Sequence, residues 1–161
     1  MPDQHATPEN FEHFKEAALV YYNSIKAVKC PYLNKMVNFN ARGKEHLLFN
    51  GRRKARSQKE QQTRLRLLRH APEIISNSKT LQGYSEQKVF ELNRSNHRNE
   101  YILTEALFYE FIAIIDKKIR IRVIVKEVGT APPYFWSVIP FWKRDHEHRK
   151  NIMRYGNPEE D

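Results

Sequence analysis

The second half of the chain is built from runs rich in β-branched and aromatic residues, a composition typical of β-strands. Four such runs follow one another, at residues 88–92, 101–115, 119–127 and 134–142. Residues 116–118 are short enough for a tight hairpin, and residues 129–133, with a glycine and two prolines, suit a longer turn. We therefore expect a meandering antiparallel sheet of about four strands.

The first half follows the period of the α-helix instead. Within residues 11–28 the apolar side chains recur at steps of three and four, which predicts an amphipathic helix closed by Pro31. A second helix is expected from Ser57 to about residue 70, because Glu60 completes a capping box with Ser57. Between these helices, residues 36–40 suit a short strand and residues 45–49 a helical turn, and a further turn follows Pro72.

Helices followed by strands indicate an α+β fold, with the N-terminal helices packed on one face of the four-stranded sheet. We expect a flexible tail at 1–12, a single nuclease-like domain at 13–142 and a charged tail at 143–161. The N-terminus lacks the cationic and apolar regions of a signal peptide, and no apolar run approaches the ~18 residues of a membrane span. With one cysteine, Cys30, the chain cannot form an internal disulfide, so we expect a cytoplasmic protein without a membrane partner.

Positive charge is concentrated in one stretch of the chain. The formal net charge is +9, and ten basic residues between Arg42 and Arg69 face two acids, Glu45 and Glu60. Such a concentration of positive charge favours the binding of a polyanion such as RNA. The alternative is an ordinary basic surface that only faces solvent. The RNA contacts expected from this stretch are Arg42, Lys44, Arg52, Arg53, Lys54 and Arg56.

The third strand predicts a basic sheet face. Its isoleucines and valines at 119, 121, 123 and 125 share one side, which leaves Arg120, Arg122 and Lys126 with Ile124 on the other. If the helices cover the apolar side, these cations are exposed and spaced to grip phosphates or a transition-state oxyanion. The alternative is a strand whose cations only face solvent.

The last strand carries aromatic rings on both sides. Strict alternation places Ser137 with Phe135, and Trp136 with Tyr134. An exposed Tyr134 or Trp136 would stack the bases of single-stranded RNA, whereas the alternative is that these rings belong to the core.

Two further residues could take part in catalysis. Arg64 lies on the leucine-rich face of the second helix, so it is either a structural ion-pair partner or an active-site cation. His46 lies among cations that favour its neutral form, the form a general base needs, although a surface or core histidine is the alternative. The spacing of His146 and His148 fits no common zinc motif, so we expect neither a metal nor another cofactor.

Several motifs together resemble a known superfamily. They are VNFNARGKEHLL at 37–48, RLRLL at 64–68, the proline at 72 followed by EII, IRVIVKEVG at 121–129 and YFWSVIPFW at 134–142. In this order they resemble the phage-type branch of the barnase, EndoU, colicin and RelE-like ribonucleases. The extra positive charge at 52–56 and the tail at 143–161 depart from that pattern.

The resemblance implies a helical N-terminal part, a four-stranded sheet and a metal-independent ribonuclease site on the open face of that sheet. Its site residues would be His46, Arg64, Lys126 or Arg122, and Ser137. Members are similar to toxins and phage-borne effectors that cut tRNA or mRNA, so a cognate antitoxin or immunity protein is an expected partner.

The leading hypothesis is therefore an endoribonuclease. His46 would deprotonate a ribose 2′-OH, Arg64, Arg122 and Lys126 would stabilise charge on the phosphorus, and Ser137 would bind a phosphate oxygen. The product would be a 2′,3′-cyclic phosphate. The alternatives are a non-catalytic RNA- or ribosome-binding protein that uses the same basic face, and a protein-binding partner that uses the aromatic face.

Overall fold

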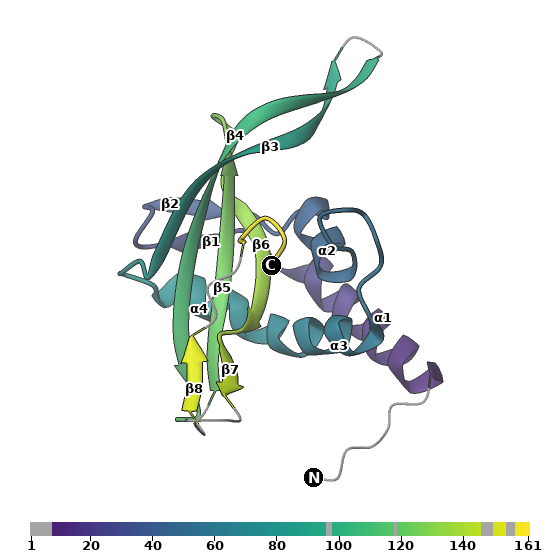
Figure 1. The fold of residues 1–161 in the computed structure, drawn as a ribbon, viewed down its shortest axis with the longest axis vertical. Helices are drawn as coiled ribbons and strands as arrows, with labels where there is room; N and C mark the ends of the chain where they lie inside the picture. Colours follow the sequence, from purple (N-terminus) through teal and green to yellow (C-terminus); the bar gives the residue numbers. More distant parts are fainter. Residues whose placement is uncertain (1–7, 96–97, 118, 146–149, 154–156) are drawn as a thin grey trace.

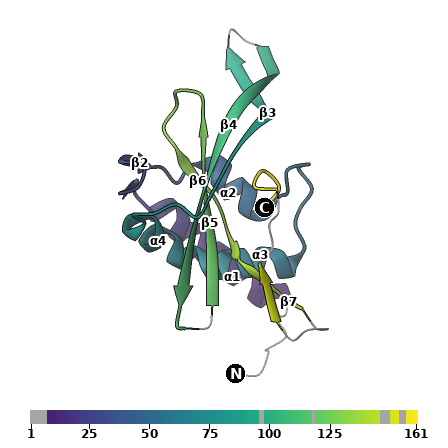
Figure 2. The same ribbon diagram turned by 60° about the vertical axis from the view of Figure 1, so that its left-hand side comes forward.

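The computed structural model describes residues 8–95, 98–117, 119–145, 150–153 and 157–161. The predicted α+β architecture is confirmed: helices come first in the chain, and a four-stranded antiparallel sheet follows them. The helices lie together beside the sheet in both views (Figures 1 and 2).

The helical part contains α1 (Pro8–Ser24), α2 (Ala41–Leu48), α3 (Gln58–Leu67), a 3-10 turn (Leu68–His70) and α4 (Ala71–Asn77). The capping box of α3 is confirmed, since Ser57 Oγ accepts from the Glu60 amide at 3.2 Å and Glu60 Oε2 accepts from the Ser57 amide at 3.2 Å. Helix α1 begins inside the stretch expected as a tail and ends before residue 28. Val28, the last residue of the predicted helix, instead begins β1 (Val28–Cys30), which pairs with β2 (Lys35–Val37).

The main sheet has the order β3-β4-β5-β6, and each strand pairs antiparallel with its neighbour in sequence. Its strands are β3 (Gly83–Ser95), β4 (Arg98–Ile115), β5 (Ile119–Val128) and β6 (Tyr134–Pro140). Strands β3 and β4 are longer than predicted, and their hairpin projects beyond the other strands (Figure 1). Two short strands, β7 (Trp142–Asp145) and β8 (Lys150–Met153), form a hairpin mostly within the predicted tail, whereas His146 and His148 lie outside the described residues.

The sheet buries both faces unequally. One face packs against the helices through Ile121, Val123 and Val125 of β5, which confirms the predicted apolar side for these three residues, whereas Ile119 is exposed. The helices contribute residues such as Tyr22 and Leu47 to this main core. A smaller cluster on the opposite face comprises Val89, Ala106, Phe108, Ile124, Tyr134 and Trp136.

A β-bulge at Trp136 corrects the predicted faces of β6. Phe135 pairs with Val125, but the next pair joins Ser137 to Ile124, so Trp136 is an extra residue opposite no partner. Beyond the bulge the alternation is shifted by one position. Ser137 therefore lies on the face of Tyr134, not on that of Phe135 as strict alternation predicted, and Val138 joins the main core.

Candidate functional site

Helix α2 lies against the edge strand β6 because a glycine faces that strand. A Cβ atom on Gly43 would lie 2.2 Å from the main-chain oxygen of Phe135, so a larger residue cannot occupy this position without displacing the backbone. The helix start is fixed by Asn40, whose Oδ1 accepts from the Gly43 amide at 3.2 Å and whose carbonyl accepts from the Tyr22 hydroxyl at 2.6 Å. This docking carries His46, one turn further along α2, to the side of Trp136.

His46 is buried between an aromatic ring and an arginine. Its ring stacks on Trp136 with the centroids 3.9 Å apart. Arg56 Nη2 lies 3.1 Å from His46 Nε2, and Arg56 Nε donates to the His46 carbonyl at 2.9 Å. Since a guanidinium has donors alone, Nε2 must accept, which places the ring proton on Nδ1. Burial, followed by the charges of Arg56, Arg64 and Lys126, lowers the pKa of His46 to about 2.

Arg64 and Ser137 form the centre of the site. Arg64 Nη1 donates to Ser137 Oγ at 2.6 Å, although the two residues belong to α3 and β6. The bulge makes this contact possible, because it turns Ser137 away from the main core. Both side chains also donate to the main-chain oxygen of Asp161. The distance from Ser137 Oγ to this oxygen is 2.5 Å. Burial and the neighbouring Arg56 lower the pKa of Arg64 to about 9, against the opposing pull of Asp161.

The two predicted cations of β5 are present in the site, but they are buried. Arg122 and Lys126 are 2 % and 1 % exposed, so the prediction of an exposed basic face is wrong for them. Each binds a carboxylate from another strand of the sheet: Arg122 pairs with Glu110 of the neighbouring β4, and Lys126 Nζ lies 2.7 Å from Glu91 Oε1 of β3, two strands away. Lys126 Nζ also lies 4.1 Å from the centre of the Trp136 ring.

An acidic run at residues 157–161, which we call the acidic segment, covers these cations. Lys126 Nζ lies 2.9 Å from Glu159 Oε2, and Arg122 Nη1 donates to Asp161 Oδ2 at 2.8 Å. Trp136 Nε1 donates to the Pro158 carbonyl at 3.0 Å. Arg56 Nη2 donates to the Glu160 carbonyl at 3.1 Å. In both ribbon views the end of the described chain lies beside β6 and α2 (Figures 1 and 2).

The structure thus brings all five residues predicted for catalysis to one place, around the acidic segment. Sequence reasoning missed the segment and the two sheet carboxylates, Glu91 and Glu110. The sequence does contain a signal for the acidic segment, because Glu159, Glu160 and Asp161 are three consecutive acids in a chain of net charge +9. Electrostatic attraction favours contact between these acids and cations elsewhere in the chain, but it does not determine which cations the acids bind.

The residues predicted to bind RNA fall into exposed and buried groups. Arg52, Arg53, Lys54 and Arg120 are exposed, with the Arg53 guanidinium 4.9 Å from the centre of the Tyr101 ring. Arg42 is also exposed and pairs with Glu91, whereas Lys44 is half-buried and its Nζ donates to Asn23 Oδ1 at 3.3 Å. The remaining three, Arg56, Tyr134 and Trp136, are buried. The prediction that Tyr134 or Trp136 is exposed and stacks RNA bases is therefore wrong, and the alternative, that these rings are packed in the interior, is confirmed.

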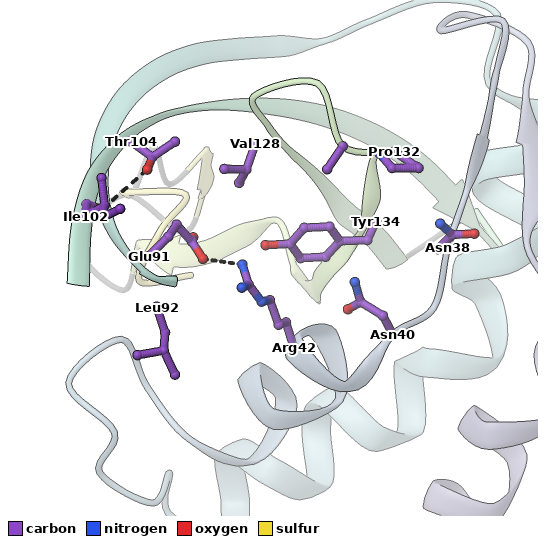
Figure 3. A pocket seen from close by; sticks show the side chains of 11 residues that line it. Asn38, Asn40, Arg42, Glu91, Leu92, Ile102, Thr104, Val128, Pro132 and Tyr134 are labelled. Atoms are coloured by element: carbon purple, nitrogen blue, oxygen red, sulfur yellow. Dashed lines mark hydrogen bonds and ion pairs between the residues drawn. The ribbon is translucent and has the colours of Figure 1, made fainter. Parts of the chain in front are cut away.

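A separate cavity of about 390 Å³ lies next to the site (Figure 3). Its lining includes Asn38, Asn40, Thr104 and Tyr134, together with the ion pair between Arg42 and Glu91. The Tyr134 hydroxyl points toward that ion pair in Figure 3. Because Glu91 also binds Lys126, this cavity and the catalytic candidates share a carboxylate.

Comparison with known proteins places the chain in no group: no family model, curated protein or solved structure matches it. Among the described residues, no helix is long and apolar enough to cross a membrane. The same part of the chain contains no group of three or more histidine, cysteine or acidic side chains arranged to hold a metal ion.

Proposed function

We propose that the protein is a metal-independent endoribonuclease of the barnase, EndoU, colicin and RelE-like type. The observation that carries the proposal is the convergence of Arg64, Ser137, Arg122 and Lys126, from three elements, on oxygen atoms of one short segment. Cations and a hydroxyl that hold several oxygens at once also suit a phosphodiester, whose negative charge increases in the transition state.

In this mechanism the ribose 2′-oxygen attacks the adjacent phosphorus, the bond to the 5′-oxygen breaks, and the leaving 5′-oxygen takes a proton from water to become a hydroxyl. Arg64, Arg122 and Lys126 stabilise the extra charge on the phosphorus, and Ser137 donates to a non-bridging oxygen. His46 accepts the 2′-OH proton at Nε2 once RNA replaces the acidic segment and the Arg56 guanidinium moves off that nitrogen. Burial is the largest cause of its lowered pKa, so a more open site raises the pKa toward the ordinary value near 6.5.

The first experiment incubates micromolar protein with total RNA in excess chelator and maps the new ends. We expect fragments that end in 2′,3′-cyclic phosphate. RNA that stays intact under these conditions, or cleavage that chelation abolishes, would falsify the proposal.

Variants then assign the residues. Because Arg64 and Ser137 lie where charge develops, Arg64→Ala and Ser137→Ala should each lower the cleavage rate by about 10²-fold or more. A matched control is Lys29→Gln, which removes one exposed cation from β1, a strand that contributes no residue to the site. Equal rates for Arg64→Ala and this control would remove Arg64 from the mechanism.

One observation favours a second candidate, an RNA-binding protein without catalysis. In the described structure His46 Nε2 is already occupied by Arg56, and the pKa of about 2 makes His46 a weak base. Substituting His46 by Gln distinguishes the two functions, because it should abolish cleavage and leave RNA affinity within about tenfold if the first proposal holds.

A further inference from the structure

We propose that the acidic segment is an intramolecular inhibitor, which occupies the positions of RNA phosphates in the site and must leave before RNA can bind. This inference rests on the proposed function, since it takes the site to be a phosphate site. It adds that the described structure is the closed state of the protein.

The contacts of the segment imitate those of a polyanion. The Glu159 carboxylate binds Lys126, the Asp161 carboxylate binds Arg122, and the Asp161 main-chain oxygen accepts from both Arg64 and Ser137. These are three separate anion positions, each filled by an oxygen that carries full or partial negative charge. A single strand of RNA offers phosphate oxygens to the same donors, so the two ligands exclude one another.

While it lies on the site, the segment forms a turn of its own. Its turn is closed from within, because the amides of Glu160 and Asp161 donate to the Asn157 carbonyl at 3.0 and 2.9 Å. The Glu159 amide also donates to Asn157 Oδ1 at 3.2 Å. Once the segment leaves the site, these turn hydrogen bonds compete with water, so they are lost together with the contacts to the site.

Departure of the segment leaves two of the site cations paired with carboxylates. Lys126 keeps its ion pair with Glu91, and Arg122 keeps its ion pair with Glu110. A buried cation without any partner would make opening very costly. The carboxylates that stay with Lys126 and Arg122 reduce that penalty, and Arg64 keeps its hydrogen bond to Ser137 Oγ. The arrangement therefore permits exchange between the segment and an external anion.

The test uses the full-length variant E159Q/D161N and a fluorescent single-stranded RNA of about twelve nucleotides. Its charge-matched control is E12Q/E16Q, which removes two exposed acids from α1. If the closed state holds at least about nine-tenths of the wild-type molecules, the site variant should bind RNA at least tenfold more tightly than wild type. The control, with the same net charge, should stay within about twofold of wild type.

Hydrogen exchange on the wild-type protein gives a second, independent readout. The amides of Glu160 and Asp161 are hydrogen-bonded in the closed state, so their exchange should accelerate when RNA saturates the protein. Equal RNA affinities for E159Q/D161N and its control, or exchange at 157–161 that saturating RNA leaves unchanged, would overturn the inference. If the variant fails to fold, the exchange measurement decides alone.

These readouts separate the inference from the proposed function. A site variant that binds RNA more tightly but cleaves none of it supports the inhibitor and contradicts the nuclease. If no variant binds RNA, inorganic tripolyphosphate serves as the probe. Faster exchange at 157–161 with tripolyphosphate then supports displacement by phosphate, and unchanged exchange contradicts it.

Discussion

At the scale of single residues, burial decides the charge of His46. The ring is 4 % exposed, stacked on Trp136 and bonded to Arg56, so protonation would place a further cation beside existing ones. The native protein therefore holds His46 neutral at every pH above about 2. An unfolded chain releases the same histidine into water, where its pKa is about 6.5.

This difference predicts a pH-dependent stability. Above about pH 6.5 His46 is neutral in the folded and in the unfolded protein, so its contribution to the free energy of unfolding is fully present. As pH falls from there toward 2, the unfolded state alone binds the proton, and the free energy of unfolding decreases by about 1.4 kcal/mol per pH unit. Between about pH 6.5 and pH 5, wild type should thus lose about 1 to 2 kcal/mol more than His46→Gln in urea titrations.

The control for this titration is His13→Gln, which replaces an exposed histidine of α1. As the pH falls, the free energy of unfolding of His13→Gln should decrease by the same amount as that of wild type. Parallel curves for wild type and His46→Gln would instead show that His46 is protonated in the folded protein.

At the scale of elements, the site depends on how closely α2 approaches β6. Gly43 permits that approach, since a Cβ atom there would overlap the Phe135 carbonyl oxygen. The approach sets the position of His46 against Trp136, and the bulge at Trp136 sets the direction of Ser137. Two backbone features thus place three of the site side chains.

Replacing Gly43 by Ala should destabilise the protein by about 1 to 3 kcal/mol, although alanine is the better helix former by about 1 kcal/mol. The reason is that backbone must move to admit the methyl group. Thermal unfolding measures the effect. At Gly51 an added Cβ meets the flexible end of the Glu160 side chain, so Gly51→Ala should change stability by less than about 1 kcal/mol. Equal losses of stability for Gly43→Ala and Gly51→Ala would contradict the close contact of α2 with β6 at Gly43.

The elements that the sequence predicts well are those with local causes. The capping box of Ser57 and Glu60 and the alternation of β5 are each contained within a few consecutive residues, and both are confirmed. The bulge was missed because residues on both sides of β6 are apolar, so a shift of one position leaves no visible break in the pattern. The acidic segment was missed because its contacts join residues up to 104 positions apart.

At the scale of the whole molecule, the positive charge has two locations. Arg122 and Lys126 of the site are paired with carboxylates, whereas Arg52, Arg53 and Lys54 form an exposed basic loop. The Asn50 side chain shapes this loop by accepting from the amides of Arg52 and Lys54 at 2.9 and 3.0 Å. Under the proposed function, this loop supplies attraction for RNA without contributing to the chemistry.

The salt dependence of RNA binding should report on the loop. Each phosphate contact to a single strand contributes about 0.7 to the slope of log affinity against log salt, so Arg52→Ala/Lys54→Ala should reduce the slope by about 1.4. The cleavage rate at saturating RNA should not change, because the loop touches no reacting atom. Titrations at several salt concentrations measure the slope, and a slope equal to that of wild type would exclude the loop from RNA contact.

The meander order of the sheet has a consequence for folding kinetics. Every strand from β3 to β6 pairs with its neighbour in sequence, so the sheet assembles through short hairpin closures. The contact of Arg64 with Ser137 spans 73 residues, and that of Arg64 with Asp161 spans 97. Such large loops form after the hairpins, since their closure entropy must be compensated by structure already in place. We therefore expect the sheet to acquire protection early in refolding and the amides at 157–161 to acquire it last.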